Sequence, residues 1–84
     1  MRVVTVTIDA AAAEAVWGRL TPHQQRLVDL SLLGYTEIEV AGRMGITWTS
    51  VGNHKRQIRS RFGGCSWLDV LRVRQAMVET TTTS

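Results

Sequence analysis

The chain has little of several residue types that particular folds and sites require. Cys65 is the only cysteine among 84 residues, so no disulfide and no cysteine-based zinc site can form within the chain. No apolar run approaches the length of a membrane span, and threonines interrupt Val3–Ile8, which is not a signal-peptide pattern. These absences favour a small protein of a reducing, intracellular compartment with no membrane association.

Acidic residues are missing from the middle third of the chain. Between Val40 and Leu68 every charged residue is basic, and this segment carries +5 although the whole chain carries only +3. The basic residues are Arg43, Lys55, Arg56, Arg59 and Arg61. Basic charge concentrated in one segment is typical of a protein that binds nucleic acid.

The residue groupings of an active site are also missing. The candidate acids and bases show no spacing suited to a catalytic dyad, a triad or a metal site, and the chain has no glycine-rich phosphate loop. The residues considered are His23, Asp29, Glu37, Glu39 and His54. We therefore expect a protein that is not an enzyme, with no catalytic residues, no metal and no cofactor.

What is present indicates one small all-α domain. Apolar residues make up 44% of the chain, which is enough for a single core at this length. Helix signals predict four to five helices, and the β-branched run Val3–Ile8 predicts a short extended segment or strand before them. We divide the chain into an N-terminal extension (1–19, strand and helix), a helix-turn-helix domain (20–79) and a disordered tail (80–84).

Capping patterns define where the helices begin. Thr21 with Pro22 and Gln24 marks one start, and Thr36 with Glu39 marks the next, since each pair fits a capping box. Further helices are predicted over 10–19, from 48 to about 61, and from 67 to about 79. The residues expected to face the core in the two capped helices are Leu27, Val28, Leu30, Leu33, Ile38, Ala41 and Met44.

The stretch after Gly45 reads as a tight turn followed by a basic helix. Gly45 suits a positive φ at a helix end, and Thr47 is a good N-cap. Val51, Ile58 and Phe62 recur at helical spacing and mark a buried stripe. Two short helices joined in this way form a helix-turn-helix, whose second helix enters the major groove of DNA. A solvated basic helix packed on a small core explains this stretch alone equally well.

From Leu20 to about Met77 the chain resembles the LuxR-type (GerE-like) helix-turn-helix family. The matching residues include Leu20-Thr21-Pro22, Gly34-Tyr35-Thr36, Glu39-Val40-Ala41, Met44-Gly45-Ile46-Thr47, Ser50-Val51, Asn53-His54, Ile58 and Gly63. The resemblance implies a cytoplasmic, bacterial or phage-type transcription regulator that binds double-stranded DNA. Its third helix would read DNA, and its fourth would form a homodimer contact.

Candidate site residues follow from the polar side chains opposite the buried stripe of the basic helix and from the resemblance. Base reading is assigned to Thr49, Gly52, Asn53, Arg56 and Gln57. Phosphate contact is assigned to Arg43, Thr47, Ser50, Lys55, Arg59 and Arg61. The helix from Trp67 has more apolar residues than one core face requires, so a dimer interface is assigned to Trp67, Leu71, Val73, Arg74, Met77 and Val78.

The chain departs from the family pattern at three positions. Gly52 stands where the family commonly has Lys, and Gln24 replaces the usual Glu of the first capping box. Lys55 stands at a usually apolar position, so it must leave the core or reach a phosphate. Only about twenty residues precede the resemblance, so a sensor domain is not expected.

Two other functions fit the same pattern. The promoter-reading fourth region of sigma factors shares the helix-turn-helix, although Gly63-Gly64 followed by a capped apolar helix favours the LuxR type. A degenerate helix-turn-helix that binds RNA polymerase or another regulator is a different class of protein. Trp48, in the first turn of the basic helix, would either touch DNA or pack against the preceding helices.

Overall fold

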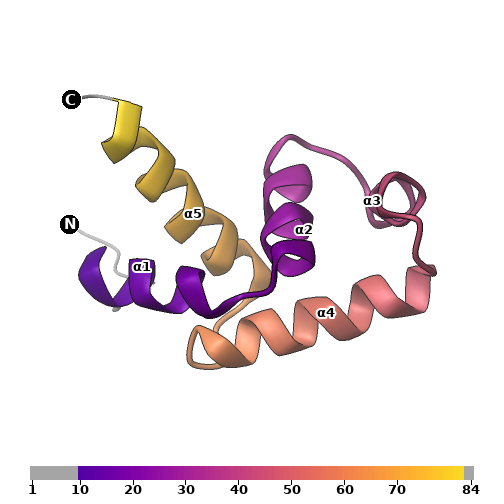
Figure 1. Cartoon of the computed structure of the whole chain (residues 1–84), viewed down its shortest axis with the longest axis horizontal. Helices are drawn as coiled ribbons and strands as arrows, with labels where there is room; N and C mark the ends of the chain where they lie inside the picture. The colour runs from indigo at the N-terminus through magenta and orange to yellow at the C-terminus, as the bar shows by residue number, and fades with distance from the viewer. Residues whose placement is uncertain (1–9, 83–84) are drawn as a thin grey trace.

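Five α-helices make up the part of the chain that this computed structural model describes, residues 10–82 (Figure 1). They are α1 (Ala10–Arg19), α2 (Pro22–Leu32), α3 (Glu37–Met44), α4 (Trp48–Arg61) and α5 (Trp67–Thr82). Residues 10–82 contain no strand, and the predicted all-α class is confirmed. The strand predicted at Val3–Ile8 lies outside the described residues.

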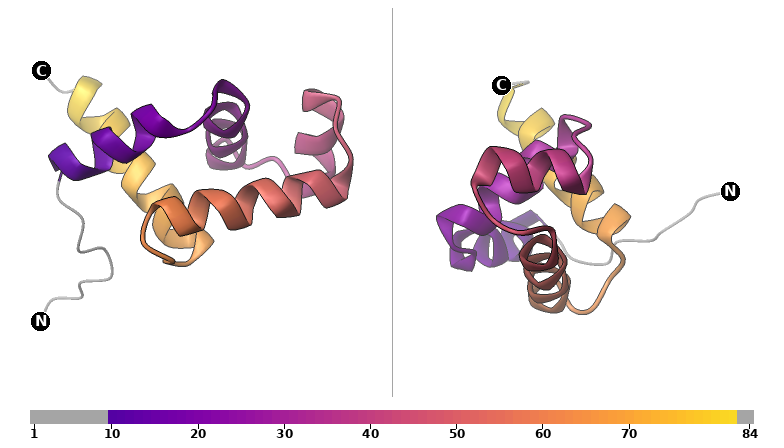
Figure 2. Two further views of the ribbon diagram at one scale, coloured as in Figure 1. Left: turned by 60° about the horizontal axis from the view of Figure 1, so that its bottom comes forward. Right: turned by 90° about the vertical axis from the view of Figure 1, so that its right-hand side faces the viewer.

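Helix α2 is the central element of the fold, because it packs against α3, α4 and α5. Helix α1 packs against α5, and these two helices lie at the opposite end of the molecule from α3 (Figure 2). Figure 1 shows α3 end-on and α4 lengthwise, so the two helices cross steeply. This arrangement leaves one long side of α4 without a covering helix.

Both predicted capping boxes are present at the starts of α2 and α3. Thr21 Oγ1 accepts from the backbone N–H of Gln24 at 3.1 Å, and the backbone N–H of Thr21 donates to Gln24 Oε1 at 3.2 Å. Thr36 and Glu39 repeat the pattern at 3.2 and 2.8 Å. The hydrogen bond from the backbone N–H of Thr36 lowers the pKa of the Glu39 carboxyl.

The core lies where α2 meets α3, α4 and α5. The largest fully buried side chains are Leu27, Val28, Val40, Val51, Ile58 and Val70. Each of these four helices contributes at least one of them. The position of α4 is therefore fixed by packing along its inner face and not only by the turn that precedes it.

Two side chains that we expected in the core are exposed. Leu33 is 75% exposed, because it is the C-cap residue that follows the last turn of α2. Ile38 is 73% exposed. It lies two positions from buried Val40, and two residues are about 200° apart around an α-helix, so Ile38 and Val40 cannot both face the core.

Helix α5 is bound more tightly into its own chain than we expected. Val73, predicted at a dimer interface, is 6% exposed and belongs to the core. Arg74, assigned to the same interface, donates from Nε to Asp29 Oδ1 at 2.8 Å, and its guanidinium lies 4.0 Å from the ring centre of Trp17. These two residues therefore join α5 to the core, to α2 and to α1.

The other residues assigned to that interface are half-buried. Trp67, Leu71 and Met77 pack against the core, and Val78 is also partly covered. Leu68 is the large apolar residue that α5 exposes, at 55%. The helix runs to Thr82, so residues 80–82 of the predicted tail are helical.

Candidate nucleic-acid interface

The turn at 45–47 joins α3 to α4 and fixes where α4 begins. Gly45 has a φ of 69°, in the left-handed region that favours glycine. Thr47 Oγ1 accepts from the backbone N–H of Ser50 at 3.1 Å and so caps α4, as predicted. The Thr47 hydroxyl also donates to Ser50 Oγ at 3.0 Å. These two predicted phosphate ligands therefore lie together at the start of α4.

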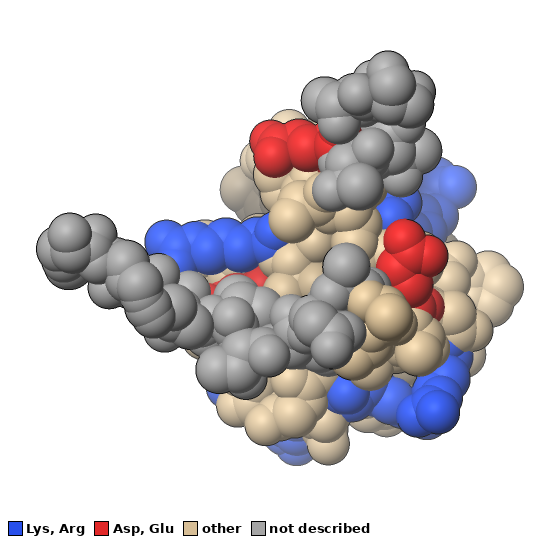
Figure 3. All heavy atoms as spheres, turned by 90° about the vertical axis from the view of Figure 1, so that its left-hand side faces the viewer, with Lys and Arg blue, Asp and Glu red and all other residues tan. Residues whose placement is uncertain are grey.

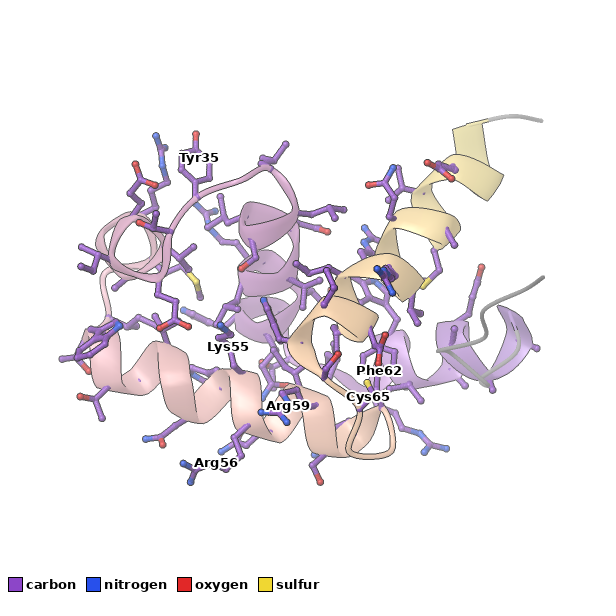
Figure 4. All side chains as sticks on the ribbon, turned by 180° about the vertical axis from the view of Figure 1, so that it is seen from behind. Tyr35, Lys55, Arg56, Arg59, Phe62 and Cys65 are labelled. Atoms are coloured by element: carbon purple, nitrogen blue, oxygen red, sulfur yellow. The ribbon has the colours of Figure 1, made fainter. Side chains whose placement is uncertain are left out.

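The outer face of α4 carries all the predicted base-reading residues. Val51 and Ile58 are fully buried beneath the helix, and Phe62 closes the same inner stripe. The residues on the other side are exposed, namely Thr49, Gly52, Asn53, Arg56 and Gln57. Figure 4 shows Arg56 pointing away from the body of the protein. The structure therefore brings these five residues to one open surface, which we call the α4 outer face.

One of these residues, Gln57, also bonds to α2. Gln24 Nε2 donates to Gln57 Oε1 at 3.0 Å across 33 positions of sequence. Gln24 is 5% exposed, and its Oε1 already accepts from the backbone N–H of Thr21. The contact was not predicted, because nothing local in the sequence indicates which side chains meet between two helices.

Lys55 has an intramolecular partner where we expected a phosphate. Its ammonium pairs with Glu37 Oε2 and lies 4.9 Å from the ring centre of Trp67. The Lys55 side chain is 20% exposed, and Figure 4 shows it directed away from Arg56. Lys55 therefore leaves the apolar core, as predicted, but it joins α4 to α3 and α5.

Glu37 of α3 accepts hydrogen bonds from side chains at the start and in the middle of α4. Trp48 Nε1 donates to Glu37 Oε1 at 3.0 Å, while Lys55 occupies the other carboxylate oxygen. The hydrogen bond from Lys55 is the main reason that the pKa of Glu37 lies below its ordinary value, although burial opposes the shift. Trp48 packs back onto α3 through this bond, yet its side chain remains 62% exposed.

Arg56 lies on the α4 outer face, and Arg59 and Arg61 follow it in the last turn of α4. Arg59 Nε donates to the Cys65 carbonyl at 2.9 Å, which fixes the Arg59 side chain against the turn after α4. Arg61 is exposed, and neither Arg61 nor Arg56 has an ion-pair partner in the part of the chain that the structure describes. Within α4 itself there is no acidic residue to offset these charges.

A cleft between α2 and α3 brings two residues beside Arg43 that we did not predict at the site, His23 and Arg26. It has a volume of about 350 Å³ and is lined by Pro22, His23, Arg26, Arg43 and Met44. Arg43, a predicted phosphate ligand, also lies 4.2 Å from the ring centre of Tyr35. His23 and Arg26 were not assigned to the site from the sequence, because their proximity to Arg43 depends on how α2 packs against α3.

The charge at the end of the molecule where α1 and α5 lie differs from that of the α4 outer face. Figure 3 shows both acidic and basic side chains on that face. Arg74 of α5, for example, is paired with Asp29 of α2. A surface that is basic without nearby acids is therefore a property of α4 and not of every face.

The described residues contain no group of three or more His, Cys, Asp or Glu side chains that could hold a metal ion. Across the same residues, no helix is long and apolar enough to cross a membrane.

The chain was compared with known proteins at three levels. No family model matches it, and neither a curated protein nor a solved structure matches it.

Proposed function

We propose that this chain binds double-stranded DNA at specific sequences and regulates transcription, with α4 in the major groove. The observation that carries the proposal is the α4 outer face, where Asn53, Arg56 and Gln57 are exposed on a helix without acidic residues. Amide and guanidinium groups match the donors and acceptors on base edges in the major groove. An α-helix with its side chains is about 10–12 Å wide, which fits a groove of about 12 Å.

Phosphate contacts would come from both flanks of this face. Arg59 and Arg61 lie towards the end of α4, and Thr47 and Ser50 lie at its start. The cleft lined by His23, Arg26 and Arg43 offers a further anion-binding surface beside the helix-turn-helix. Such contacts position a protein on DNA without reading its sequence.

The resemblance to the LuxR-type family supports the same function. Its motifs Gly45-Ile46-Thr47 and Asn53-His54 fall on the turn before α4 and on α4. On this proposal the protein acts in a bacterial or phage-type cytoplasm.

A homodimer formed through α5 is part of the proposal. The surface of α5 that remains for a partner includes exposed Leu68 and half-buried Leu71. A twofold dimer would place two copies of α4 about 34 Å apart, on two half-sites of a palindromic operator.

A second candidate is a module that binds RNA polymerase or another regulator. The exposed side chains of Ile38 and Trp48, on neighbouring helices α3 and α4, favour it. Large exposed apolar residues are common at protein interfaces. A module of this kind would show little affinity for DNA of any sequence.

Selection of bound duplexes from a random DNA pool tests the proposal. The proposed function predicts enrichment of one sequence motif, made of two inverted half-sites if the dimer forms. The matched control is a protein with Arg56→Ala, Asn53→Ala and Gln57→Ala, which keeps the flanking arginines. The control should bind DNA without enriching the motif, whereas a wild-type protein that enriches nothing contradicts sequence-specific binding.

A further inference from the structure

A chain of hydrogen bonds runs from the start of α2 to the α4 outer face. The backbone N–H of Thr21 donates to Gln24 Oε1 at 3.2 Å, and Gln24 Nε2 donates to Gln57 Oε1 at 3.0 Å. This series of hydrogen bonds joins the N-terminal cap of α2 to an exposed residue of α4. Gln24, the residue between them, is buried.

The backbone N–H of Thr21 determines which atom donates and which accepts in each of these hydrogen bonds. A backbone N–H can only donate, so the Gln24 atom that faces Thr21 must be the amide oxygen. The other end of the Gln24 amide is then the nitrogen, which can only donate, and the Gln57 atom that faces it must be the oxygen. The Gln57 amide is thereby left with its nitrogen free to face outwards.

A glutamine at position 24 orients Gln57 in this way, and a glutamate would not. Glutamate would also complete the capping box with Thr21, since that contact needs an acceptor. A carboxylate has no hydrogen to donate, however, so it would accept from Gln57 and turn the Gln57 oxygen outwards. Glutamine at position 24 would therefore turn the nitrogen of the Gln57 amide outwards, and glutamate would turn its oxygen outwards.

We propose that Gln24 is a positioning residue that sets the base preference of Gln57. With its nitrogen outwards, Gln57 donates to the base edges that present acceptors alone, guanine O6 and N7 or thymine O4, and disfavours the amino groups of cytosine and adenine. Gln24 acts from the core of the protein without touching DNA. This inference rests on the proposed function, because it concerns how α4 reads a base.

The test is the base preference of Gln24→Glu, measured with the same random DNA pool. We expect the preference at one position of the half-site to change from guanine or thymine to cytosine or adenine. The change should be about fivefold to tenfold in relative affinity, as for one hydrogen-bonded base contact. Preferences at the other positions should stay the same, because Arg56 and Asn53 are untouched.

Two variants control for charge and for folding. His23→Glu adds the same charge in the same turn of α2 but makes no bond to Gln57, so it should lower affinity for all sequences alike. Gln57→Glu changes an exposed residue and presents an oxygen on both sides, so it should show the same cytosine or adenine preference as Gln24→Glu. Wild-type base preference in Gln24→Glu, or an equal loss on every sequence, overturns the inference.

Amide hydrogen exchange in the free protein separates this inference from the proposed function. The Gln24 side-chain amide should exchange more slowly than the Gln57 amide, and Gln57→Ala should remove that protection. If Gln24 is unprotected, the chain of bonds is absent and the inference fails even where DNA binding holds. If Gln24 is protected but the wild-type protein enriches no motif, the proposed function fails, and the reading of bases by Gln57 fails with it.

Discussion

At the scale of single residues, Arg56 and Arg61 test the two proposed kinds of DNA contact, base reading and phosphate binding. Arg56 points outwards from the middle of the α4 outer face, and Arg61 lies at the end of the helix. Arg56→Ala should weaken binding to the selected sequence by about 1–3 kcal/mol and relax the preference at one base pair. Arg61→Ala should weaken all sequences alike. Fluorescence anisotropy on selected and scrambled duplexes distinguishes them, and equal losses by both variants on both duplexes contradict this assignment.

Glu37 is a second residue whose role is open to test, because it holds α4 through Trp48 and Lys55. Its pKa is lowered in the folded protein, chiefly by the hydrogen bond from Lys55. A carboxyl with a lowered folded pKa stabilises the fold above its unfolded pKa, and this stability is lost as the pH falls through the folded value. The ion pair therefore weakens only in acid.

Glu37→Gln should reduce the free energy of unfolding at neutral pH by up to about 1 kcal/mol, because the carboxylate is partly exposed. The difference from wild type should shrink as the pH falls below the ordinary glutamate value of 4.5. Urea unfolding at several pH values measures it. Glu14→Gln, at an exposed position of α1, is the matched control. A difference that stays constant between neutral pH and pH 3 would show that the Glu37 charge does not stabilise α4.

At the scale of elements, two glycines of the helix-turn-helix give opposite predictions. A Cβ at Gly45 or at Gly52 would meet nothing within 4 Å, but Gly45 has a positive φ and Gly52 lies inside α4. Gly45→Ala should therefore destabilise the protein by about 1 kcal/mol. Gly52→Ala should stabilise it by about 0.5–1 kcal/mol, because alanine favours a helix. Urea unfolding measures both, and stabilisation by Gly45→Ala would contradict the left-handed turn.

The elements also show what the sequence could predict and why. The starts of α2, α3 and α4 depend on caps such as Thr21, Thr36 and Thr47 that bond three residues ahead, so local patterns were sufficient. The buried stripe of α4 was predicted from helical spacing. Ile38 was misplaced because the apolar residues of the short helix α3 fit more than one inward face. Leu33 was misplaced because it follows the last turn of α2 as its C-cap residue.

The parts of the candidate site that were missed all depend on how helices pack. Lys55 meets Glu37 across 18 positions, and Gln24 meets Gln57 across 33. No periodic pattern relates such pairs, because the distance between two helices is set by the whole core. The cleft beside Arg43 was missed for the same reason. The exposure of the α4 outer face was predictable, because this face lies on the side of the helix opposite the buried stripe.

At the scale of the whole molecule, self-association is tested by two changes in α5. Leu68→Glu changes an exposed residue and should keep the fold within about 0.5 kcal/mol, while it weakens a dimer formed through α5. Val73→Glu places a charge in the core of one chain and should unfold it. Sedimentation at tens of micromolar measures the dimer. A wild-type chain that stays monomeric with and without DNA contradicts the dimer.

The salt dependence of affinity tests most directly whether α4 and its flanking cations bind DNA and read its sequence, as we propose. Affinity is measured for the selected duplex and for a scrambled duplex at several salt concentrations. About four phosphate contacts per protomer predict that log affinity falls with log salt at a slope near −4 on both duplexes. The selected duplex should bind at least about tenfold more tightly at each salt concentration. A slope near zero, or identical affinities for the two duplexes, would contradict the account.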